Sequence, residues 1–309
     1  MKNILITGGA GNIGGSLVRA LVKNGSYFVQ IVDNLSTGKM DNLPDQNIGN
    51  WDFIQCDVNN NSEISSVMRG VKFDVVFHYA AMVGVERTQL NPLGVLQDIE
   101  GIKNILNLSK ETNVKRVFYA SSSEVYGEAV STYQHEITTP LNSRLPYAIV
   151  KNVGESFFRS YGEEHGLKYT IFRFFNTYGP LQNNDFVVSR FINKALNNED
   201  IYIYGDGSQS RTFLHINDNI SFTLKVLSDD AFINDIVNVG NDKEVTVKEL
   251  ANIIKDMLNS KSKINYIDPL KEGDMQRRRP DIMKMIEFYK KDLISIEDGI
   301  SLIMQEWNS

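Results

Sequence analysis

The sequence predicts an α/β fold in which a Rossmann-type, doubly wound parallel sheet carries a smaller C-terminal α/β lobe. Three observations predict it. Short β-branched runs alternate with helical segments through the first half of the chain, a glycine-rich turn follows the first run, and the runs are apolar at successive positions, as in strands buried on both faces. With 309 residues, 42% of them hydrophobic, the chain is long enough for one large or two fused domains.

Six strands and four helices are expected in the first half. The β-branched runs place the strands, and apolar residues that recur every three or four positions place the helices. The expected strands are 3–7, 27–33, 51–56, 75–79, 117–121 and 169–175, and the expected helices are 14–23, 63–69, 93–111 and 147–165. This alternation predicts helices on both faces of a parallel sheet.

After the stretch RFFNTYGP the chain changes character, because Asn, Asp and Gly separate shorter elements. We therefore expect a first domain over 1–177 and a smaller lobe over 178–309. The lobe should contain a helix at about 187–197 and another that begins at Thr246, where Thr246 and Glu249 form a capping box ahead of a buried stripe of Leu250, Ile253, Ile254 and Met257. The stretches RTFLHINDNI and IVNVG look like strands, so segments near 211–240 are expected to return to the first domain.

Composition excludes several classes of protein. The formal net charge of −6 gives no electrostatic basis for binding nucleic acid or an anionic membrane. No stretch approaches the roughly 20 apolar residues that span a bilayer, and the apolar run at 4–6 is too short for the core of a signal peptide. The single cysteine, Cys56, cannot form an internal disulfide and fits a reducing compartment. A cytoplasmic protein with no membrane or nucleic-acid partner is therefore expected.

The stretch TGGAGNIGG lies where the first expected strand meets the first expected helix. Gly9, Gly11 and Gly14 satisfy G-x-G-x-x-G, and Gly8, Gly11 and Gly14 satisfy the looser G-x-x-G-x-x-G. Either pattern allows a tight turn, lets a pyrophosphate approach the backbone, and places its charge at a helix N-terminus. The residues expected to bind a dinucleotide in this turn are Gly8, Gly11, Asn12, Ile13 and Gly14.

An acid ends the second expected strand. Asp33 is placed to accept hydrogen bonds from the adenosine ribose and to repel a 2′-phosphate, and no Arg or Lys adjoins it. The expected cofactor is therefore NAD rather than NADP. Asp57, after the third strand, is a candidate adenine contact, and no metal site is expected.

A second group of residues points to a reaction. Tyr147 and Lys151 are four residues apart in a segment with helical spacing, which places both side chains on one helix face. A phenol has a pKa of about 10, and a neighbouring ammonium together with a positive nicotinamide ring would lower it, so that Tyr147 could act as a base. The serines of YASSSEVYGE, at the end of the fifth strand, supply a hydroxyl at the edge where parallel sheets bind ligands.

Together these motifs resemble those of the extended short-chain dehydrogenases/reductases, in the NAD-dependent nucleotide-sugar epimerase/dehydratase family. The resemblance runs nearly end to end in family order, through TGGAGNIG, VDNLSTG, CDV, HYAA, SSSEVYG, PYAIVK, RFFNTYGP, YGDGSQSRTF, NVG and GDMQRRRPDI. It implies an NAD-binding Rossmann domain over 1–177, a nucleotide-sugar-binding lobe over 178–309, and a nucleotide-diphosphate sugar as substrate.

The resemblance also implies roles for individual residues. Ser122 becomes the catalytic hydroxyl, Tyr147 the base that takes the sugar hydroxyl proton, and Lys151 the residue that holds the nicotinamide ribose and lowers the tyrosine pKa. The implied cofactor contacts are Asp33 and Asn34 at the adenosine ribose, Asp57 and Val58 at the adenine, and Ala80 and Ala81 along the fourth strand. The implied substrate contacts are Ser123, Asn176, Arg211, Lys271 and Arg277.

Two positions depart from the family pattern. The chain reads QDIEGIKN, with Asp98 and Ile102, where family members often carry Asn before a G-T step. Lys271 stands where Arg is common, and lysine cannot offer a bidentate fork to a diphosphate. Arg277 or Arg279 is the expected substitute.

The step that the resemblance implies is oxidation at C4 of a pyranose, and the fate of the 4-keto sugar decides the product. Return of the hydride to the other face gives an epimer, loss of water a 4-keto-6-deoxy sugar, and loss of CO2 a pentose. Relatives that eliminate water or CO2 carry a glutamate where this chain has Glu124, so Glu124 favours further chemistry at C5 or C6. An epimerase/dehydratase-type enzyme is expected, with a 4-dehydrogenase or a UDP-glucuronate-type decarboxylase as alternatives.

The same motifs disfavour two other functions. A non-catalytic NAD-binding sensor would be expected to have lost the serine or Tyr-x-x-x-Lys, and a short-chain alcohol or steroid reductase would lack the second lobe.

The segments 93–111 and 147–165 carry broad apolar stripes, and the corresponding helices of the family form a four-helix bundle between subunits. A homodimer is therefore expected.

Overall fold

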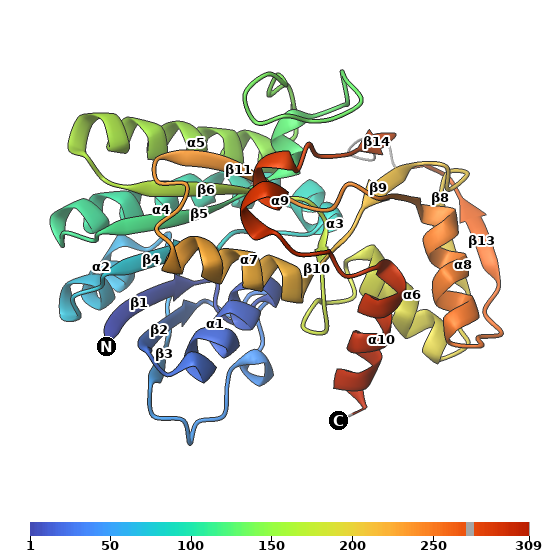
Figure 1. Ribbon diagram of the computed structural model, residues 1–309, viewed down its shortest axis with the longest axis horizontal. Coiled ribbons are helices and arrows are strands. Elements are labelled where there is room, and N and C mark those ends of the chain that lie inside the picture. The colour runs from blue at the N-terminus through green and yellow to red at the C-terminus, as the bar shows by residue number, and fades with distance from the viewer. Residues whose placement is uncertain (270–274, 309) are drawn as a thin grey trace.

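A seven-stranded parallel sheet forms the centre of the computed structural model, which describes residues 1–269 and 275–308 (Figure 1). The strand order is β11-β6-β5-β4-β1-β2-β3, so the order reverses at β1, whose neighbours are β2 and β4. The strands are β1 (Lys2–Thr7), β2 (Tyr27–Asp33), β3 (Trp51–Gln55), β4 (Val75–His78), β5 (Arg116–Ser122), β6 (Tyr169–Phe174) and β11 (Asp235–Val239). Ligands of such sheets bind outside the carboxyl ends of the strands, next to the reversal.

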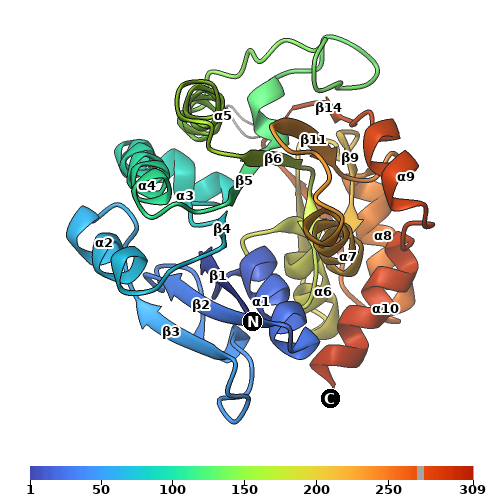
Figure 2. The same cartoon turned by 60° about the vertical axis from the view of Figure 1, so that its left-hand side comes forward.

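Helices cover both faces of this sheet (Figure 2). One face carries α1 (Asn12–Asn24), α7 (Ile216–Ser228) and α9 (Met283–Tyr289). The other carries α2 (Asn61–Gly70), α4 (Pro92–Glu111) and α5 (Pro146–His165), with α4 and α5 side by side. The short helices α3 (Val85–Leu90), η1 (Met40–Asn42) and η2 (Ser123–Tyr126) lie in the connections.

The alternation of side chains along β1 explains the two layers. Ile4 and Ile6 are fully buried in the cluster formed with α1 and α7, whereas Leu5 is fully buried in the cluster formed with α2, α4 and α5. Full burial of one such side chain contributes about 1.5–3 kcal/mol. A strand that is apolar at every position is therefore stable only between two helical layers.

The C-terminal lobe has its own core, between α6 (Val187–Leu196), α8 (Val247–Met257) and α10 (Ile296–Trp307). It contains the pair β8 (Ile201–Tyr204) and β13 (Ile264–Ile267), and the three strands β9 (Ser210–Thr212), β12 (Glu244–Thr246) and β14 (Arg277–Arg278). A further pair, β7 (Thr177–Tyr178) and β10 (Leu214–His215), connects the lobe to the sheet. The predicted capping box is present, because Thr246 Oγ1 accepts the Glu249 N–H at 3.1 Å and Glu249 Oε2 accepts the Thr246 N–H at 2.8 Å.

The expected elements of the first half are confirmed to within two residues at each end, but RTFLHINDNI is not one strand. Its first part forms β9 and β10, which lie outside the main sheet, and α7 begins at Ile216. His215 caps this helix, since its Nδ1 accepts the Asn217 N–H at 3.3 Å, and Ile220, Phe222 and Val226 give it a buried face against the sheet. Asp218 in the first turn also favours a helix start, because an acid there complements the helix dipole. IVNVG does form a strand, and β11 pairs in parallel with β6.

No helix in the described part of the chain is long and apolar enough to cross a membrane.

Candidate active site

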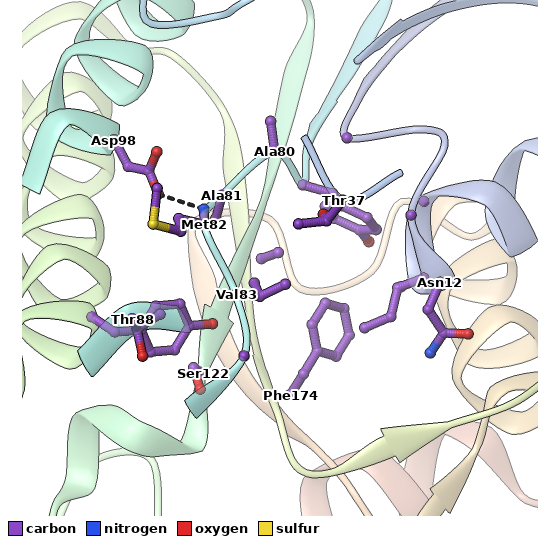
Figure 3. Close-up of a pocket in the computed structure, with 18 of the residues that line it drawn as sticks. Asn12, Thr37, Ala80, Ala81, Met82, Val83, Thr88, Asp98, Ser122 and Phe174 are labelled. Atoms are coloured by element: carbon purple, nitrogen blue, oxygen red, sulfur yellow. Dashed lines mark hydrogen bonds between the residues drawn. The ribbon is translucent and has the colours of Figure 1, made fainter. Parts of the chain in front are cut away.

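A cavity of about 870 Å³ opens at the carboxyl ends of β1, β2, β4, β5 and β6 (Figure 3). Its lining comes from the glycine turn, the ends of these strands, the N-terminal part of α5, and the segment that leads into α6. The volume lies toward the upper end of the range for small-molecule sites. The cavity is therefore large enough for a ligand of the size of a dinucleotide.

The structure brings most of the predicted site residues together in this cavity. Those that line it are Gly8, Gly11, Asn12, Ile13, Gly14, Asp33, Asn34, Asp57, Val58, Ala80, Ala81, Ser122, Ser123, Glu124, Tyr147, Lys151 and Asn176. Lys271 lies outside the described residues. Arg211 and Arg277 are described but are not part of the cavity wall.

The glycine turn is shaped by two positions that exclude a side chain. Gly8 has φ +70, and a Cβ there would lie 2.7 Å from the backbone nitrogen of Ala80. A Cβ on Gly14 would collide with the carbonyl oxygen of Gly8. Gly8, Gly11 and Gly14 line the cavity, so the G-x-x-G-x-x-G pattern is the one that describes its wall.

The N-terminus of α1 is suited to a phosphate. Within the described residues, the N-cap Gly11 provides no side-chain cap, the first turn of α1 holds no acid, and the buried Oδ1 of Asn12 has no hydrogen-bond partner. Uncapped amides at a helix start carry partial positive charge. These features fit the pyrophosphate of a dinucleotide.

Asp33 is fixed by the backbone on both sides. Its Oδ2 accepts the Ala10 N–H at 3.0 Å and its Oδ1 accepts the Leu35 N–H at 2.8 Å. A carboxylate accepts about two hydrogen bonds on each oxygen, so both oxygens retain capacity for ribose hydroxyls. The position at the end of β2 therefore fits the adenosine ribose of NAD.

A wall of backbone runs from the end of β4 past Ala80 and Ala81 to Met82. Asp98, on α4, accepts the Met82 N–H at 2.7 Å through Oδ2, and Figure 3 shows this bond beside the cavity. Asn59 donates to Asp98 Oδ1 at 3.5 Å from the other side. Burial raises the pKa of the Asp98 carboxyl, while the Met82 amide and the Lys151 ammonium lower it.

The serine, the tyrosine and the lysine meet where β5 ends against α5. Ser122 and Tyr147 line the same edge of the cavity, where the Ser122 side chain acts to lower the pKa of the phenol, and Lys151 Nζ donates to the carbonyl oxygen of Ala120 at 2.7 Å. Lys151 Nζ lies 5.6 Å from the centre of the Tyr147 ring. The four-residue spacing on α5 thus places both side chains against the end of one strand.

Burial controls the protonation of this group. It lowers the pKa of Lys151 to about 8, and the Asp98 carboxylate counteracts part of that effect. It also raises the pKa of the Tyr147 phenol above its ordinary value, although the hydrogen bond from Ser122 acts in the opposite direction. The expected lowering of the tyrosine pKa is therefore not produced by the surroundings that the chain itself supplies, because desolvation of the phenolate outweighs the favourable contacts.

Glu124 and Arg278 form an ion pair inside the cavity. Arg278 Nη1 lies 2.8 Å from Glu124 Oε1, and the side chains are 7% and 15% exposed. Among the described residues, Glu124 Oε2 and Arg278 Nε are buried without a hydrogen-bond partner. The pair therefore holds one unsatisfied acceptor and one unsatisfied donor, both buried in the wall of the cavity.

Arg278 is the arginine that lines the cavity, whereas the sequence favours its neighbours Arg277 and Arg279. Arg277 Nη2 and Nε bind Glu244 at 2.5 Å and 2.7 Å, and Arg279 Nη1 reaches the same carboxylate at 3.3 Å. Successive residues of a strand point to opposite sides, so the middle arginine of QRRRP faces the cavity when the outer two face Glu244. The alternation of side chains along β14 is the feature from which the orientation of Arg278 could have been predicted.

Of the predicted substrate contacts Asn176 and Arg211, only Asn176 lines the cavity. Asn176 lines the cavity with φ 32, and its Nδ2 donates to the carbonyl oxygen of Thr212 at 2.9 Å, which joins the end of β6 to β9. Arg211 Nη1 donates to the carbonyl oxygen of Ser210 at 2.8 Å.

Comparison with known proteins identifies the family of this chain. The sequence profile of the NAD dependent epimerase/dehydratase family matches residues 4–240. A UDP-N-acetyl-alpha-D-glucosaminuronate decarboxylase of Bacillus cytotoxicus is 32% identical over 320 residues, covering 98% of this chain and 97% of that protein. A crystal structure of UDP-glucose 4-epimerase from Thermotoga maritima, solved with UDP-glucose, has a TM-score of 0.92 at 30% identity and covers 99% of this chain and 98% of its own.

A third relative carries out another reaction. The dTDP-glucose 4,6-dehydratase DesIV of Streptomyces venezuelae, solved with NAD bound, has a TM-score of 0.90 at 27% identity and covers 99% of this chain and 97% of its own. Epimerase, decarboxylase and dehydratase thus share this architecture. The family match covers more than half of the chain. The protein belongs to the NAD dependent epimerase/dehydratase family and is an NAD-dependent enzyme of the nucleotide-sugar class.

Proposed function

We propose that this enzyme oxidises C4 of the sugar in a nucleotide-diphosphate sugar, and that Ser122, Tyr147 and Lys151 carry out the step. The observation that supports the proposal is their meeting at one edge of the cavity that the glycine turn also lines. Ser122, Tyr147 and the buried ammonium of Lys151 give that edge a hydroxyl, a phenol and a positive charge.

Each side chain has one task in this step. Ser122 holds the oxygen of the C4 hydroxyl, and Tyr147 accepts its proton as the C4–H bond breaks and the C=O bond forms. When bound, NAD⁺ supplies the acceptor for the hydride that leaves C4. Lys151 stabilises the phenolate that burial alone disfavours, so its ammonium form is the active one.

The remaining assignments follow the position of each residue. Asn12, Ile13 and the turn glycines would hold the NAD pyrophosphate, Asp33 and Asn34 the adenosine ribose, Asp57 and Val58 the adenine, and Ala80 and Ala81 the body of the cofactor. Ser123 and Asn176 face the part of the cavity left for the sugar nucleotide, and Arg278 joins them. Arg211, Lys271 and Arg277 remain candidates for the diphosphate.

A second step at C5 or C6 is favoured by the Glu124–Arg278 pair. A 4-keto uronate is a β-keto acid, so its C5–C6 bond can break with loss of CO2, leaving the electron pair in a C4 enolate that takes a proton at C5. Arg278 is placed to hold the departing carboxylate, and Glu124 to exchange a proton on the C5/C6 side. The same pair could serve loss of water across C5 and C6, which instead begins with removal of the C5 proton, made acidic by the C4 ketone, and ends with departure of the C6 hydroxyl as water.

A panel of nucleotide sugars with different bases and C6 substituents tests both steps by product mass. A loss of 44 indicates a decarboxylase, a loss of 18 a dehydratase, a loss of 2 a dehydrogenase, and an unchanged mass with altered stereochemistry an epimerase. The proposal of C4 oxidation would be overturned if Tyr147→Phe turned over every substrate at the wild-type rate.

A further inference from the structure

Glu124 and Arg278 come from segments that are far apart in the chain, and one buried side chain is hydrogen-bonded to both segments. Glu124 lies in η2 after β5, and Arg278 lies in β14 of the C-terminal lobe. Asn238, in β11, is 0% exposed and stands opposite Arg173 of β6 in the parallel ladder. Asn238 therefore joins the two segments, in addition to the direct hydrogen bond from the Gln276 N–H to Glu128 Oε1 at 3.2 Å.

The side-chain amide of Asn238 is fully engaged. Its Oδ1 accepts the Tyr126 hydroxyl at 2.7 Å, and its Nδ2 donates to the carbonyl oxygens of Gln134 at 2.8 Å and Asp281 at 3.2 Å. Its backbone N–H donates to Glu136 Oε1 at 2.8 Å. An amide side chain with both donors and its acceptor used has one orientation.

The first of these bonds holds the turn that carries Glu124. Tyr126 is two residues after Glu124 in η2, and its hydroxyl also accepts a hydrogen bond from Arg173 Nη1 at 2.8 Å. Arg173 is in turn fixed by Glu155, with Nη2–Oε2 at 2.7 Å between side chains that are 2% and 0% exposed. The turn is therefore anchored to the rigid interior of the sheet domain.

The other two bonds hold the segment that carries Arg278. Asp281 follows Arg278 by three residues, and its N–H donates to the Gln134 carbonyl oxygen at 2.9 Å, the same atom that Asn238 contacts. The Gln134 N–H donates to the carbonyl oxygen of Arg279 at 2.8 Å. The backbone after Arg278 is thus clamped between Gln134 and Asn238.

We propose that Asn238 is a positioning residue that sets the separation between Glu124 and Arg278 and thereby controls the step at C5 or C6. This inference rests on the second step of the proposed function. Within 1–269 and 275–308, none of the hydrogen bonds of Asn238 reaches Ser122, Tyr147 or Lys151. Ser122 Oγ accepts the Glu124 N–H at 3.2 Å and so contacts the same turn, but Ser122 is also held in β5 by its pairing with β6. Loss of the amide should therefore slow the second step more than the oxidation at C4.

Crystal structures of Asn238→Ala and Tyr126→Phe test the geometry without any reaction. Asn238→Ala removes the acceptor of the Tyr126–Asn238 hydrogen bond, and Tyr126→Phe removes its donor. We expect the Arg278 Nη1–Glu124 Oε1 distance to exceed the 4.0 Å of an ion pair in Asn238→Ala and to lengthen in Tyr126→Phe. A distance that stays at 2.8 Å in both would overturn the inference. Tyr126→Phe keeps the ring and serves if Asn238→Ala does not fold.

Rapid mixing with NAD⁺ and UDP-glucuronate as the probe tests the consequence. Absorbance of NADH follows the oxidation, and released CO2 follows the second step. We expect CO2 release to fall about tenfold to a hundredfold in both variants, because misplacement by about 1 Å costs that much, while NADH forms within about threefold of the wild-type rate. The double variant should lose little more than either single one, since both break the same connection.

Asn219→Ala is the matched control. Asn219 is also 0% exposed, and its Nδ2 donates to Thr177 Oγ1 at 3.0 Å, a contact that involves neither η2 nor β14. The Asn219→Ala variant should leave the ratio of CO2 release to NADH formation unchanged. Equal losses in both steps for Asn238→Ala would mean a general structural role and would overturn the inference. If the wild-type enzyme leaves UDP-glucuronate unchanged, decarboxylation of that sugar is refuted, and the crystal structures alone decide the role of Asn238.

Discussion

Arg278 Nη1 of the C-terminal lobe lies 2.8 Å from Glu124 Oε1 at the end of β5, and this ion pair closes one side of the cavity. Arg278→Lys keeps the charge but loses the planar fork. We expect the step at C5 or C6 to slow by about tenfold or more, while NADH formation on rapid mixing is preserved. The loss should exceed that in Arg277→Lys, whose guanidinium is held by Glu244. Equal effects of the two variants would contradict the assignment of Arg278.

Tyr147→Phe should abolish turnover without unfolding the enzyme. Removal of a general base lowers rates by about 10²–10⁴-fold. Measured turnover of the nucleotide sugar identified by the panel checks the loss, and NAD-dependent thermal stabilisation checks that the cofactor site remains. Tyr161→Phe, on the same helix, removes a hydroxyl that bonds to Asn107 Oδ1 at 2.6 Å and should keep full activity. Comparable losses in both variants would indicate damage to α5 and no specific role.

Asp98→Asn should move the alkaline limb of activity to lower pH. Lys151 must carry its proton, burial lowers its pKa to about 8, and Asp98 is the carboxylate that raises it. Activity should therefore fall as pH rises through about 8 in the wild type. Asparagine keeps an acceptor for the Met82 N–H but removes the negative charge. The pH at which activity declines should therefore be lower by about 1 unit.

The pH dependence of kcat/KM for NAD⁺ measures this limb in the free enzyme. The titratable groups near Lys151 and Asp98 are Asp57, His78, Tyr119 and Tyr147. Glu100→Gln is the control, because Glu100 lies on the same helix but is exposed and paired with Lys103 at 3.0 Å. Superimposable profiles for Asp98→Asn and wild type would mean that the Asp98 charge has no influence on Lys151.

His78 should make the fold sensitive to acid. It is buried, and Thr7 Oγ1 accepts the N–H groups of Tyr79 and Ala80 and therefore donates to His78 Nδ1, at 2.9 Å. Burial, and next the Lys151 ammonium, lower its pKa from 6.5 to about 3. The neutral ring is thus the folded form, and its contribution is complete above pH 6.5 and is lost as pH falls toward 3.

By linkage, this residue accounts for a loss of about 2 kcal/mol in the free energy of unfolding between pH 7 and pH 5. Urea unfolding at the two pH values measures the change. In His78→Gln, which keeps an acceptor for Thr7, the loss should be smaller by about that amount. An identical loss in the two proteins would show that His78 takes up no proton on unfolding.

We expect the enzyme to form a homodimer through α4 and α5. Part of the apolar stripe predicted on α4 is used inside the protomer, since Val95, Ile102 and Ile105 are at most 2% exposed. Leu93 and Leu96 on α4 remain 75% and 39% exposed, and Ile149 on α5 is 41% exposed. Such side chains on adjacent helices are typical of a subunit interface.

Sedimentation velocity at micromolar concentration measures the oligomeric state. The double variant Leu93→Glu, Leu96→Glu should sediment as a monomer, because it places two charges on the expected interface without touching the core. Leu196→Glu changes a leucine of similar exposure on α6 and should leave the dimer intact. A wild-type protein that sediments only as a monomer would contradict the prediction.

Local chemistry determined much of the fold and of the cofactor site. The β-branched runs fixed the strands because only a sheet covered on both faces buries residues such as Ile4, Leu5 and Ile6 together. Gly8 and Gly14 could be recognised from the sequence because each has a local constraint: Gly8 adopts φ +70 in the turn, and a Cβ on Gly14 would strike the carbonyl oxygen of Gly8. Tyr147 and Lys151 could be paired because the period of a helix places them on one face.

Contacts between distant segments could not be determined in this way. RTFLHINDNI is apolar enough for a strand, and only the cluster against the sheet shows that Ile220 and Phe222 belong to a helix. QRRRP offers three equivalent arginines, and the position of Glu244 across the lobe decides that Arg278 faces the cavity. The direction of the Tyr147 pKa likewise follows from burial, which the sequence does not specify. Spacing along the chain fixes what neighbouring residues can do, whereas desolvation and charge pairing depend on which remote segments the completed fold brings against them.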